Sequence, residues 1–440
     1  MEAPEGALHI IRTLQARGHQ ALLAGGCVRD RLMGRTPGDW DIATGAPPEE
    51  VVRLFERTTA VGIQFGVVRV LAGDGEYEVA RFREDDIYID GRRPESVRFA
   101  GAREDALRRD LTINGMFCDP LTGEVLDYVG GREDIAARRI RAIGEAGARF
   151  REDHLRMLRA VRFAALLDFE IEKDTFAAIR ANAPLIRKTS APRVREELTR
   201  MLTGPRAGAA FQLLLDAGLL GEILPEAAAM DGVLQPPEFH PEGDVWTHVR
   251  LMLDRMEAPT PSLAWGVLLH DVGKPPTFQR ADRIRFNGHA KAGTKMTEDI
   301  CARLQMSNED AQRIRDLVAH HMRFLHVRQM RESRLKRFLR EPFMPDLLEL
   351  HRLDCLVSHG GLRTNNFCRE KLAELEAEGL TPARLLDGEG LIAMGFSPGP
   401  LFAEILEAVE DEQLEGRVQT REEAEAFVRR RFGAGAGGGD

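Results

Sequence analysis

The sequence predicts an α+β protein in which a mixed sheet with helices is followed by domains built of helices alone. Apolar runs of strand length lie at 21–24, 67–71 and 77–82, among turns rich in glycine and aspartate. From about residue 148 onward these runs fade, and apolar side chains recur with helical spacing. The chain has 440 residues, 43% of them hydrophobic and 30% charged, so it is long enough for several domains and is not disordered throughout.

The changes in pattern divide the chain. A predicted helix at 6–17 leads into the apolar run at 21–24, and the polar stretch at 84–98 is expected to be a mobile loop. Helical periodicity covers 152–166, 193–203 and 207–220, and a proline-rich break follows at 235–244. The predicted parts are a head at 1–140, a neck at 141–205, a helical body at 206–239, a second helical domain at 240–360 and a helical tail at 361–440.

The charge distribution excludes a globally basic coat for nucleic acid, because 61 basic residues stand against 70 acidic ones and the net charge is −9. Basic charge is local instead. Between residues 131 and 162 there are nine arginines, no lysine and five acids. Arginine suits the geometry of phosphate, so this segment is a candidate surface for a polyanion. The alternative is an ordinary solvated helix surface.

The sequence has an odd number of cysteines, five, and no CxxC pair. This argues against a disulfide-linked partner and indicates a reducing compartment. The N-terminal sequence has no signal-peptide pattern. The most apolar stretch, 207–230, is broken by acids and a proline and predicts buried helix, not a membrane span. We therefore expect a cytoplasmic protein with no membrane partner.

Two short motifs near the N-terminus suggest phosphate chemistry. Gly25 and Gly26 lie where an apolar strand turns into a helix, and such a turn lets the backbone approach a phosphate. Asp39 and Asp41 are two residues apart, so on a strand they share one face, where paired carboxylates can hold divalent ions. Each motif alone also fits an ordinary turn.

Further polar residues extend this candidate site. Glu78, in the predicted strand YEVARF, is a candidate third carboxylate, with a plain surface position as the alternative. In DALRRDLTINGMF, Arg108 and Arg109 can clamp a triphosphate and Asp110 can accept hydrogen bonds from ribose hydroxyls, with Asn114 on the same predicted helix. The alternative there is a helix start of mixed charge.

The order of these motifs resembles the class II tRNA nucleotidyltransferase and bacterial poly(A) polymerase family. GG-x-VRD is followed by D-x-D, RRD-x-T-x-N, YVGGREDI, FREDHLRMLRAVRF and RVREELTRML, over about residues 20–205. The resemblance implies a polymerase-β-like nucleotidyltransferase head that transfers CMP and AMP from CTP and ATP to the 3′ end of tRNA. It implies Mg²⁺ at Asp39 and Asp41, and contacts to phosphate or ribose from Gly25, Gly26, Arg29, Arg108 and Arg109.

A protein template for the incoming base is predicted in the neck. In E-D-x-x-R, a continuous helix would project Asp153 and Arg156 from one face, with Arg159 a turn further on. Aspartate accepts and arginine donates, so the pair matches the base edges of cytosine and adenine and leaves charges unpaired against guanine and uracil. The resemblance implies the same role. A surface salt bridge is the alternative.

The resemblance leaves the choice of product open. In the family, the loop between the D-x-D and RRD motifs helps the switch to ATP, and here a loop with Asp90, Arg92 and Arg93 is present. It argues against an enzyme that adds only two cytidines. An enzyme that adds only the final adenosine and a poly(A) polymerase remain alternatives.

Nine of the twelve histidines fall between 240 and 359. Their pattern with aspartates, H…HD…H…H…D, resembles the HD superfamily of metal-dependent phosphohydrolases over about 240–360. The resemblance implies a divalent transition metal (Mn, Ni, Co, Fe or Zn) that activates water against a phosphoester. The candidate metal ligands are His248, His270, Asp271 and Asp354, and Lys274, His289 and His320 are candidates to hold phosphate or a second ion.

Two alternatives remain for this region. A histidine on an apolar helix is often an ordinary core residue whose hydrogen bonds are satisfied within the protein. The chain could also be chiefly an HD phosphohydrolase, acting on a phosphomonoester or cyclic phosphodiester, with a degenerate head that only binds RNA. The intact motifs of the head argue against this second alternative.

Overall fold

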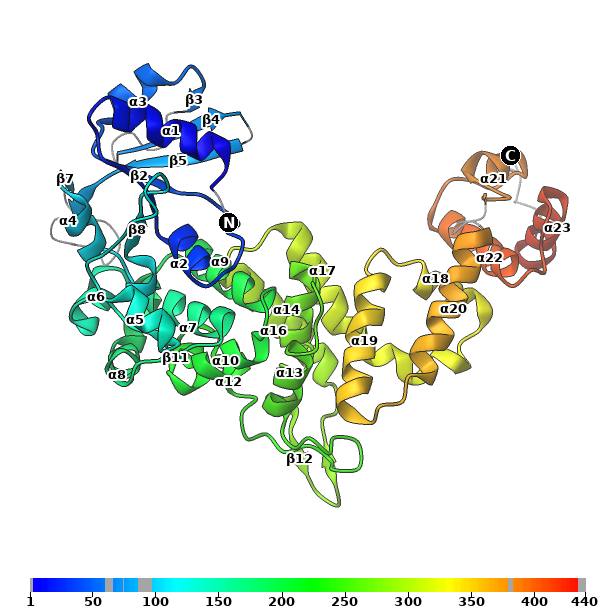
Figure 1. Cartoon of the computed structure of the whole chain (residues 1–440). Coiled ribbons are helices and arrows are strands. Elements are labelled where there is room, and N and C mark those ends of the chain that lie inside the picture. The colour runs from blue at the N-terminus through cyan, green and yellow to red at the C-terminus, as the bar shows by residue number, and fades with distance from the viewer. Residues whose placement is uncertain (1–2, 60–65, 74, 86–96, 379–382, 434–440) are drawn as a thin grey trace. The chain divides into compact units, whose positions relative to one another are not determined.

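The computed structural model describes residues 3–59, 66–73, 75–85, 97–378 and 383–433. The predicted loop residues Asp90, Arg92 and Arg93 lie outside these ranges. The chain forms two compact units, residues 1–231 with 299–306, and residues 232–298 with 307–440 (Figure 1). The finer division into head, neck, body, second helical domain and tail stays a prediction.

The first unit contains a seven-stranded sheet with the order β3-β4-β5-β2-β1-β8-β9. Strands β2 and β5 are parallel, and all other neighbours are antiparallel. This mixed sheet with helices confirms the predicted fold class. The strands are β1 (Ala21–Ala24), β2 (Ile42–Thr44), β3 (Thr58–Thr59), β4 (Val67–Ala72), β5 (Gly75–Arg81), β8 (Met116–Cys118) and β9 (Val125–Asp127).

Strand β1 is buried along its whole length because both faces of the sheet are covered. Leu23 packs into the core that includes helix α1 (Glu5–Ala16), whereas Leu22 and Ala24 face a second cluster with Phe82 and Phe117. An unbroken apolar run is the pattern expected of a strand buried on two sides. This burial holds the chain rigidly up to the glycine turn that follows it.

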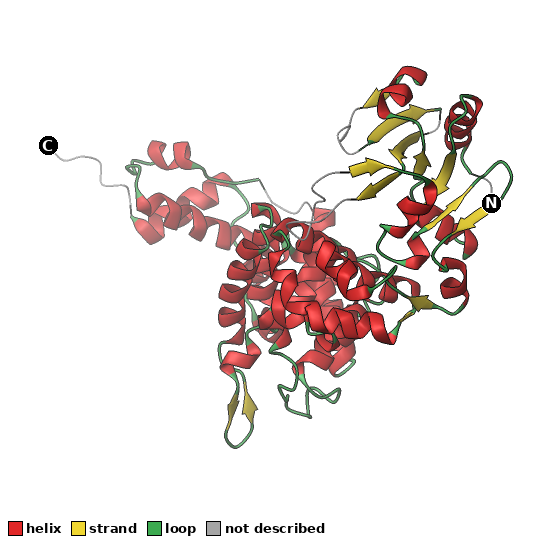
Figure 2. Ribbon diagram, turned by 90° about the vertical axis from the view of Figure 1, so that its left-hand side faces the viewer, coloured by secondary structure: helices red, strands yellow, loops and turns green. Residues whose placement is uncertain are grey.

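Short helices and strand pairs complete the first unit, and the helices after residue 146 pack against one another, α7 on α9 and α10 (Figure 2). Their bounds are α2 (Gly26–Leu32), α3 (Pro48–Leu54), β6 (Arg83–Asp85), β7 (Val97–Phe99), α4 (Ala102–Leu107), η2 (Thr112–Asn114), α5 (Gly131–Ala136), β10 (Arg139–Ile140), α6 (Ala146–Glu152), α7 (Leu155–Leu167), β11 (Glu170–Ile171), α8 (Lys173–Asn182), η3 (Ala183–Lys188), α9 (Ala191–Leu202), α10 (Ala207–Asp216), α11 (Leu219–Ile223) and α12 (Pro225–Ala228).

The predicted helix at 152–166 is wrong at its start. Helix α6 ends at Glu152 and α7 begins at Leu155, because Asp153 has an extended backbone. The Asp153 carboxylate accepts a hydrogen bond from the Leu155 backbone N–H two residues on (3.1 Å), which makes an Asx turn between α6 and α7. Asp153 therefore lies in the break between two helices, and Arg156 lies on the first turn of the second.

A buried aspartate joins three segments of the first unit and gives a test of stability. Asp134 is fully buried and accepts hydrogen bonds from Thr112 Oγ1 (2.6 Å) and Arg141 Nε (2.8 Å). Asp134→Ala leaves these donors without their acceptor and is expected to lower the free energy of unfolding by about 2–4 kcal/mol. Scanning calorimetry should detect the change. The neighbouring exposed Glu133→Ala is the control, and equal effects of the two changes would contradict this account.

The second unit is helical apart from one short hairpin. Helix α14 is buried along nearly its whole length and is packed by α13, α17 and α19, so side chains at its C-terminal end face an enclosed interior. The elements are α13 (Val245–Leu253), α14 (Pro261–Leu269), α15 (Lys274–Thr277), β12 (Gln279–Arg280), β13 (Ile284–Arg285), α16 (His289–Arg303), α17 (Asn308–His320), η4 (His321–Gln329), α18 (Glu332–Leu339), α19 (Met344–Ser358), α20 (Arg363–Glu378), α21 (Gly388–Ala393), α22 (Pro400–Leu414) and α23 (Arg421–Phe432).

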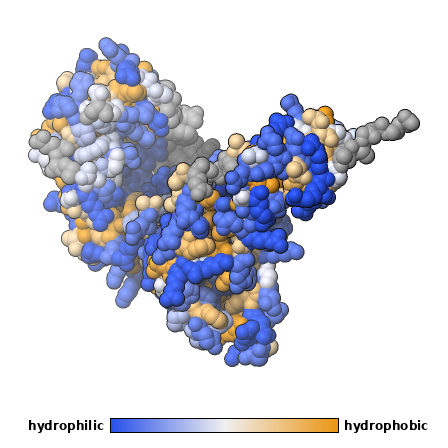
Figure 3. Space-filling view, turned by 90° about the vertical axis from the view of Figure 1, so that its right-hand side faces the viewer, coloured by the Kyte–Doolittle hydropathy of each residue, from blue (hydrophilic) through white to orange (hydrophobic). Residues whose placement is uncertain are grey.

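Within the described ranges, no helix combines the length and apolar character needed to cross a membrane. Hydrophilic side chains cover most of the surface in view in Figure 3. None of the five cysteines forms a disulfide, and all five are buried.

Candidate active sites

Three carboxylates lie at one end of the parallel strand pair β2–β5. Asp39 and Asp41 directly precede β2, and are not on the strand as predicted. The register pairs Ile42 with Val79, so Asp41 lies beside Glu78. We call Asp39, Asp41 and Glu78 the sheet carboxylates.

The sheet carboxylates repel one another. Asp41 is solvent-accessible but flanked by protein, and this partial desolvation, together with the charges of Glu78 and Asp39, raises its pKa to about 6 although Arg109 opposes the shift. Carboxylates held this close at a raised pKa are typical of a site for a divalent cation. The chemistry of these donors therefore fits Mg²⁺.

The glycine turn lies next to these carboxylates. Gly25 has a φ of +71°, and its N–H donates to the Met116 carbonyl (3.1 Å). The positive φ favours glycine, and a Cβ at Gly25 would also come within 2.9 Å of Arg109 Nη1, so a larger residue would displace this guanidinium. The turn thus brings the backbone before α2 close to Arg109.

Arg108 and Arg109 share one buried partner, Asp105, which the sequence analysis did not identify. Arg108 Nη2 donates to one Asp105 oxygen (2.6 Å) and Arg109 Nη2 to the other (3.0 Å). Burial alone would raise the pKa of Asp105, but the two arginines lower it overall. The ionised Asp105 therefore fixes the direction of both guanidinium groups.

Residues from three motifs join in one buried chain of hydrogen bonds. Arg29 Nη1 donates to Asn114 Oδ1 (2.7 Å), Asn114 Nδ2 donates to Asp110 Oδ1 (3.4 Å), and Arg159 Nε donates to Asp110 Oδ2 (2.6 Å). Burial raises the pKa of Asp110, but Arg159 outweighs it and the pKa falls far below its usual range. Arg29 is only 6% exposed, and its guanidinium also donates to Asp30 (Nε to Oδ1, 2.9 Å), so protein partners hold it in place.

The two predicted base-selecting residues are each held by a charged neighbour. Arg193 on α9 donates to both oxygens of Asp153, at 3.2 and 2.7 Å. Arg156 Nη1 donates to Glu152 (2.5 Å), and Arg156 Nη2 donates to the backbone carbonyl of Arg108 (3.1 Å). Protein partners thus hold both side chains in one orientation.

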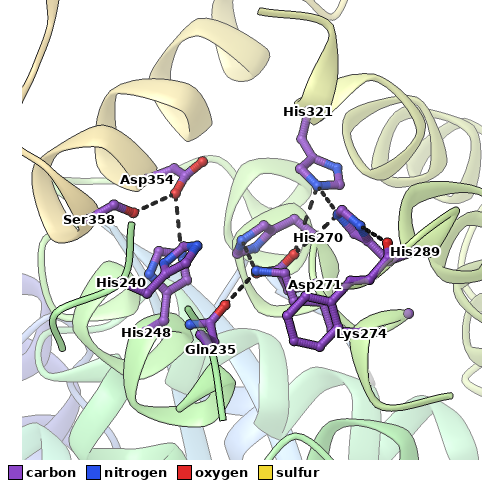
Figure 4. Close-up of polar contacts among 12 residues, drawn as sticks. Gln235, His240, His248, His270, Asp271, Lys274, His289, His321, Asp354 and Ser358 are labelled. Atoms are coloured by element: carbon purple, nitrogen blue, oxygen red, sulfur yellow. Dashed lines mark hydrogen bonds and ion pairs between the residues drawn. The ribbon is translucent and has the colours of Figure 1, made fainter. Parts of the chain in front are cut away.

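A histidine–aspartate cluster lies at the C-terminal end of α14 (Figure 4). His248 Nε2 is 3.3 Å from Asp354 Oδ1, and His270 Nε2 is 3.2 Å from Asp271 Oδ2. Neither imidazole Nε2 makes a hydrogen bond of acceptable geometry with any described residue, although both rings are buried. Buried nitrogens without such a partner are costly, and a bound metal ion would satisfy them, so the residues fit a divalent transition metal.

Asp271 faces a second group of possible ligands with its other oxygen. Asp271 Oδ1 is 3.7 Å from His289 Nε2 and 3.8 Å from His321 Nε2. In each of the two groups, His248–His270–Asp271 and Asp271–His289–His321, the ligand atoms lie within 4.8 Å of one another. Asp271 is therefore placed to bridge two ions.

The charges within the cluster also favour a cation. Burial, followed by the neighbouring His270, lowers the pKa of His321 to about 3, so this ring is neutral as a metal ligand must be. Burial also lowers the pKa of His248, but its close contacts with the carboxylates of Asp354 and Glu242 outweigh burial and raise that pKa to about 9. The carboxylates around His248 thus attract positive charge.

Two predicted residues have different surroundings from those expected. His320 stacks on Phe343, with ring centres 5.2 Å apart. His321, and not His320, faces Asp271 and His289, because adjacent side chains point in different directions where α17 gives way to η4. Lys274 Nζ pairs with Asp271 (2.7 Å) and donates to Gln235 (2.6 Å). In this arrangement Lys274 neutralises the central carboxylate.

The chain matches three family models. They are described as "Poly A polymerase head domain" at residues 21–141, "Probable RNA and SrmB- binding site of polymerase A" at 168–230, and "HD domain" at 244–355. The CCA-adding enzyme of Bacillus pumilus is 37% identical over 299 residues, which cover 67% of this chain and 69% of that protein. The chain belongs to the CCA-adding enzyme family.

Other relatives in the family match over shorter stretches. The CCA-adding enzyme of Geobacillus thermodenitrificans is 49% identical over 214 residues, or 48% of this chain. The match spans about half the length of that relative, 53%.

A solved structure matches over nearly the whole chain. The crystal structure of the Bacillus stearothermophilus CCA-adding enzyme in complex with CTP superimposes with a TM-score of 0.77 at 29% identity, and the match covers 98% of both chains.

In this member of the CCA-adding enzyme family, sequence reasoning identified the charged motifs but missed the residues that hold them. Asp105 lies three and four positions before the two arginines that it binds, a helical spacing that could have indicated the pairing. Arg193 lies forty residues from Asp153, and no local signal joins them. Glu242 lies on an irregular segment before α13, where periodicity is uninformative.

Proposed function

We propose that the protein adds CMP and AMP, from CTP and ATP, to the 3′ end of tRNA and releases pyrophosphate. The observation that carries the proposal is the pair Asp153 and Arg156, each held by a charged neighbour. Membership in the CCA-adding enzyme family supports it. The five cysteines form no disulfide, which is consistent with a reducing compartment, so we place the reaction in the cytoplasm.

In the proposed reaction, Asp39 and Asp41 would hold Mg²⁺, with Glu78 beside them. The ions supply activation of the attacking 3′-hydroxyl and neutralise charge on the leaving pyrophosphate. Arg108 and Arg109, held by Asp105, would face the phosphates with fixed guanidinium groups. Asp153 would accept from the exocyclic amine of cytosine or adenine, while Arg156 would donate to the adjacent ring nitrogen.

Single substitutions test the template. Arg156→Ala removes the only donor in the proposed pair and is expected to lower kcat/KM for CTP and ATP by about 10–100-fold, the value of one lost charge-assisted hydrogen bond. Incorporation of GTP and UTP should rise relative to CTP. Primer extension with each nucleotide alone measures both effects. Arg151→Ala, at a largely exposed arginine of α6, is the matched control. Unchanged selectivity in Arg156→Ala would remove the template from the proposal.

The poly(A) polymerase alternative shares the head motifs. The relatives compared above are CCA-adding enzymes, which favours the addition of both nucleotides. A long run of adenosines added without CTP would instead support a poly(A) polymerase. Addition of a single adenosine, only to tRNA that already ends in two cytidines, would support an A-adding enzyme.

We also propose that the histidine–aspartate cluster hydrolyses a phosphomonoester or a cyclic phosphodiester. The buried Nε2 atoms of His248 and His270 carry this proposal. A divalent transition metal bound there would supply activated water. Asp271, with an oxygen facing each group of ligands, would hold the metal site together, and Asp354 would complete it from α19.

A further inference from the structure

A buried carboxylate lies behind the metal-facing side of His248. Glu242 precedes α13, and its side chain is 5% exposed. Its Oε1 atom is 2.6 Å from His248 Nδ1 and 2.9 Å from His240 Nδ1. His248 therefore has a carboxylate on each side, Glu242 at Nδ1 and Asp354 at Nε2.

The distances assign different roles to these two carboxylates. Metal–ligand bonds of about 2.0–2.2 Å place neighbouring ligand atoms about 2.9–3.4 Å apart. The 3.3 Å between His248 Nε2 and Asp354 Oδ1 fits two ligands of one ion. The 2.6 Å between His248 Nδ1 and Glu242 Oε1 is shorter than that range and fits a direct hydrogen bond.

We propose that Glu242 is a positioning residue that makes Nε2 the metal-binding nitrogen of His248. A metal-bound imidazole is neutral and carries one proton. Because an ionised carboxylate only accepts hydrogen bonds, that proton lies on Nδ1 of His248. The lone pair is then on Nε2, which faces Asp354. Such a carboxylate partner fixes the tautomer and ring orientation of a metal-bound histidine and increases its basicity. This inference rests on the proposed metal-dependent hydrolysis.

His240 also contacts Glu242, but it is neither a metal ligand nor needed to position His248. Its Nδ1 shares the same Glu242 oxygen, and its ring meets His248 edge to face with centres 5.0 Å apart. The other carboxylate oxygen, Oε2, is buried with no hydrogen-bond partner among the described residues. The negative charge of Glu242 is thus directed mainly at the two imidazoles, and through His248 toward the metal.

Cobalt binding by the full chain tests the inference. The protein, stripped of metal by a chelator and dialysed, would be titrated with Co²⁺ while its visible absorption bands report affinity and coordination. Glu242→Ala is expected to weaken Co²⁺ binding by about 10–100-fold and to change the bands. Glu242→Gln should recover part of the loss, because its amide oxygen can accept the same bond. His240→Phe should bind Co²⁺ like the wild type, and thermal melting would show that each variant is folded.

The outcomes separate this inference from the function on which it rests. If wild-type protein binds no Co²⁺, the proposed metal-dependent hydrolysis is wrong and the inference falls with it. If the wild type binds Co²⁺ and folded Glu242→Ala binds it equally well, only the positioning role is overturned. A loss in His240→Phe as large as that in Glu242→Ala would also overturn it, since His240, Glu242 and His248 would then form a metal site of their own.

Discussion

Asp41→Asn is expected to lower the rate of nucleotide incorporation by at least about 1000-fold, because metal-stabilised charge in a transition state is worth several kcal/mol. The substitution keeps the shape of the side chain but removes the charge that Mg²⁺ needs. Partial desolvation and the charges of Glu78 and Asp39 raise the pKa of Asp41 to about 6. Single-turnover extension of a tRNA transcript with CTP measures the effect.

The matched control for this prediction is Glu76→Gln. Glu76 is on the same strand as Glu78 but is half exposed, and it pairs with Arg69 at 3.6 Å. The same carboxylate-to-amide change there should alter incorporation less than about twofold, as expected for a surface ion pair. If Asp41→Asn retained wild-type incorporation, the sheet carboxylates would not be the metal site.

The double variant His270→Ala, Asp271→Ala is expected to lose the transition metal and to lower phosphoester hydrolysis by at least about 1000-fold. His270 contributes a buried nitrogen without a hydrogen-bond partner in the described chain, and Asp271 faces both groups of ligands. Without these two residues, each group of ligands keeps too few atoms to bind a metal ion. Elemental analysis of the purified protein and hydrolysis of bis(p-nitrophenyl) phosphate measure the two effects. Chelation of the wild type should reproduce the loss of hydrolysis.

Adjacent histidines offer a sharp control for the cluster. His321→Ala removes a ring within hydrogen-bonding distance of His289 (3.1 Å), whereas His320→Ala removes a ring that stacks on Phe343. Only the first change should reduce metal content. An equal loss of metal in both variants would show that metal binding depends on the structure of this helix end and not on the His321 imidazole. Unchanged metal content and hydrolysis in the double variant would contradict the assignment of the cluster.

Elements governed by local pattern could be predicted from the sequence. The run Ala21–Ala24 is an unbroken apolar segment followed by two glycines, and the structure forms a buried strand and a left-handed turn there. The predicted helix at 6–17 corresponds to Glu5–Ala16, because its apolar residues recur on one face. These features depend on neighbouring residues alone.

Features governed by single side chains or by distant partners could not be predicted in this way. At the helix break, Asp153 makes a local hydrogen bond to the Leu155 backbone, but the helical periodicity of the sequence continues across the break. The choice of His321 over His320 depends on where α17 gives way to η4, a difference of one residue. Residues brought together from distant segments, such as Arg193 with Asp153, leave no pattern in one sequence.

Extension of three tRNA transcripts by the wild-type protein tests the central proposal most directly. The transcripts would end before the CCA sequence, after its first C and after its second C, and products would be resolved at single-nucleotide length. With Mg²⁺, CTP and ATP, the account predicts that all three transcripts are completed to CCA and that GTP and UTP are refused. Long adenosine tails, or extension of only the transcript that ends in two cytidines, would contradict it.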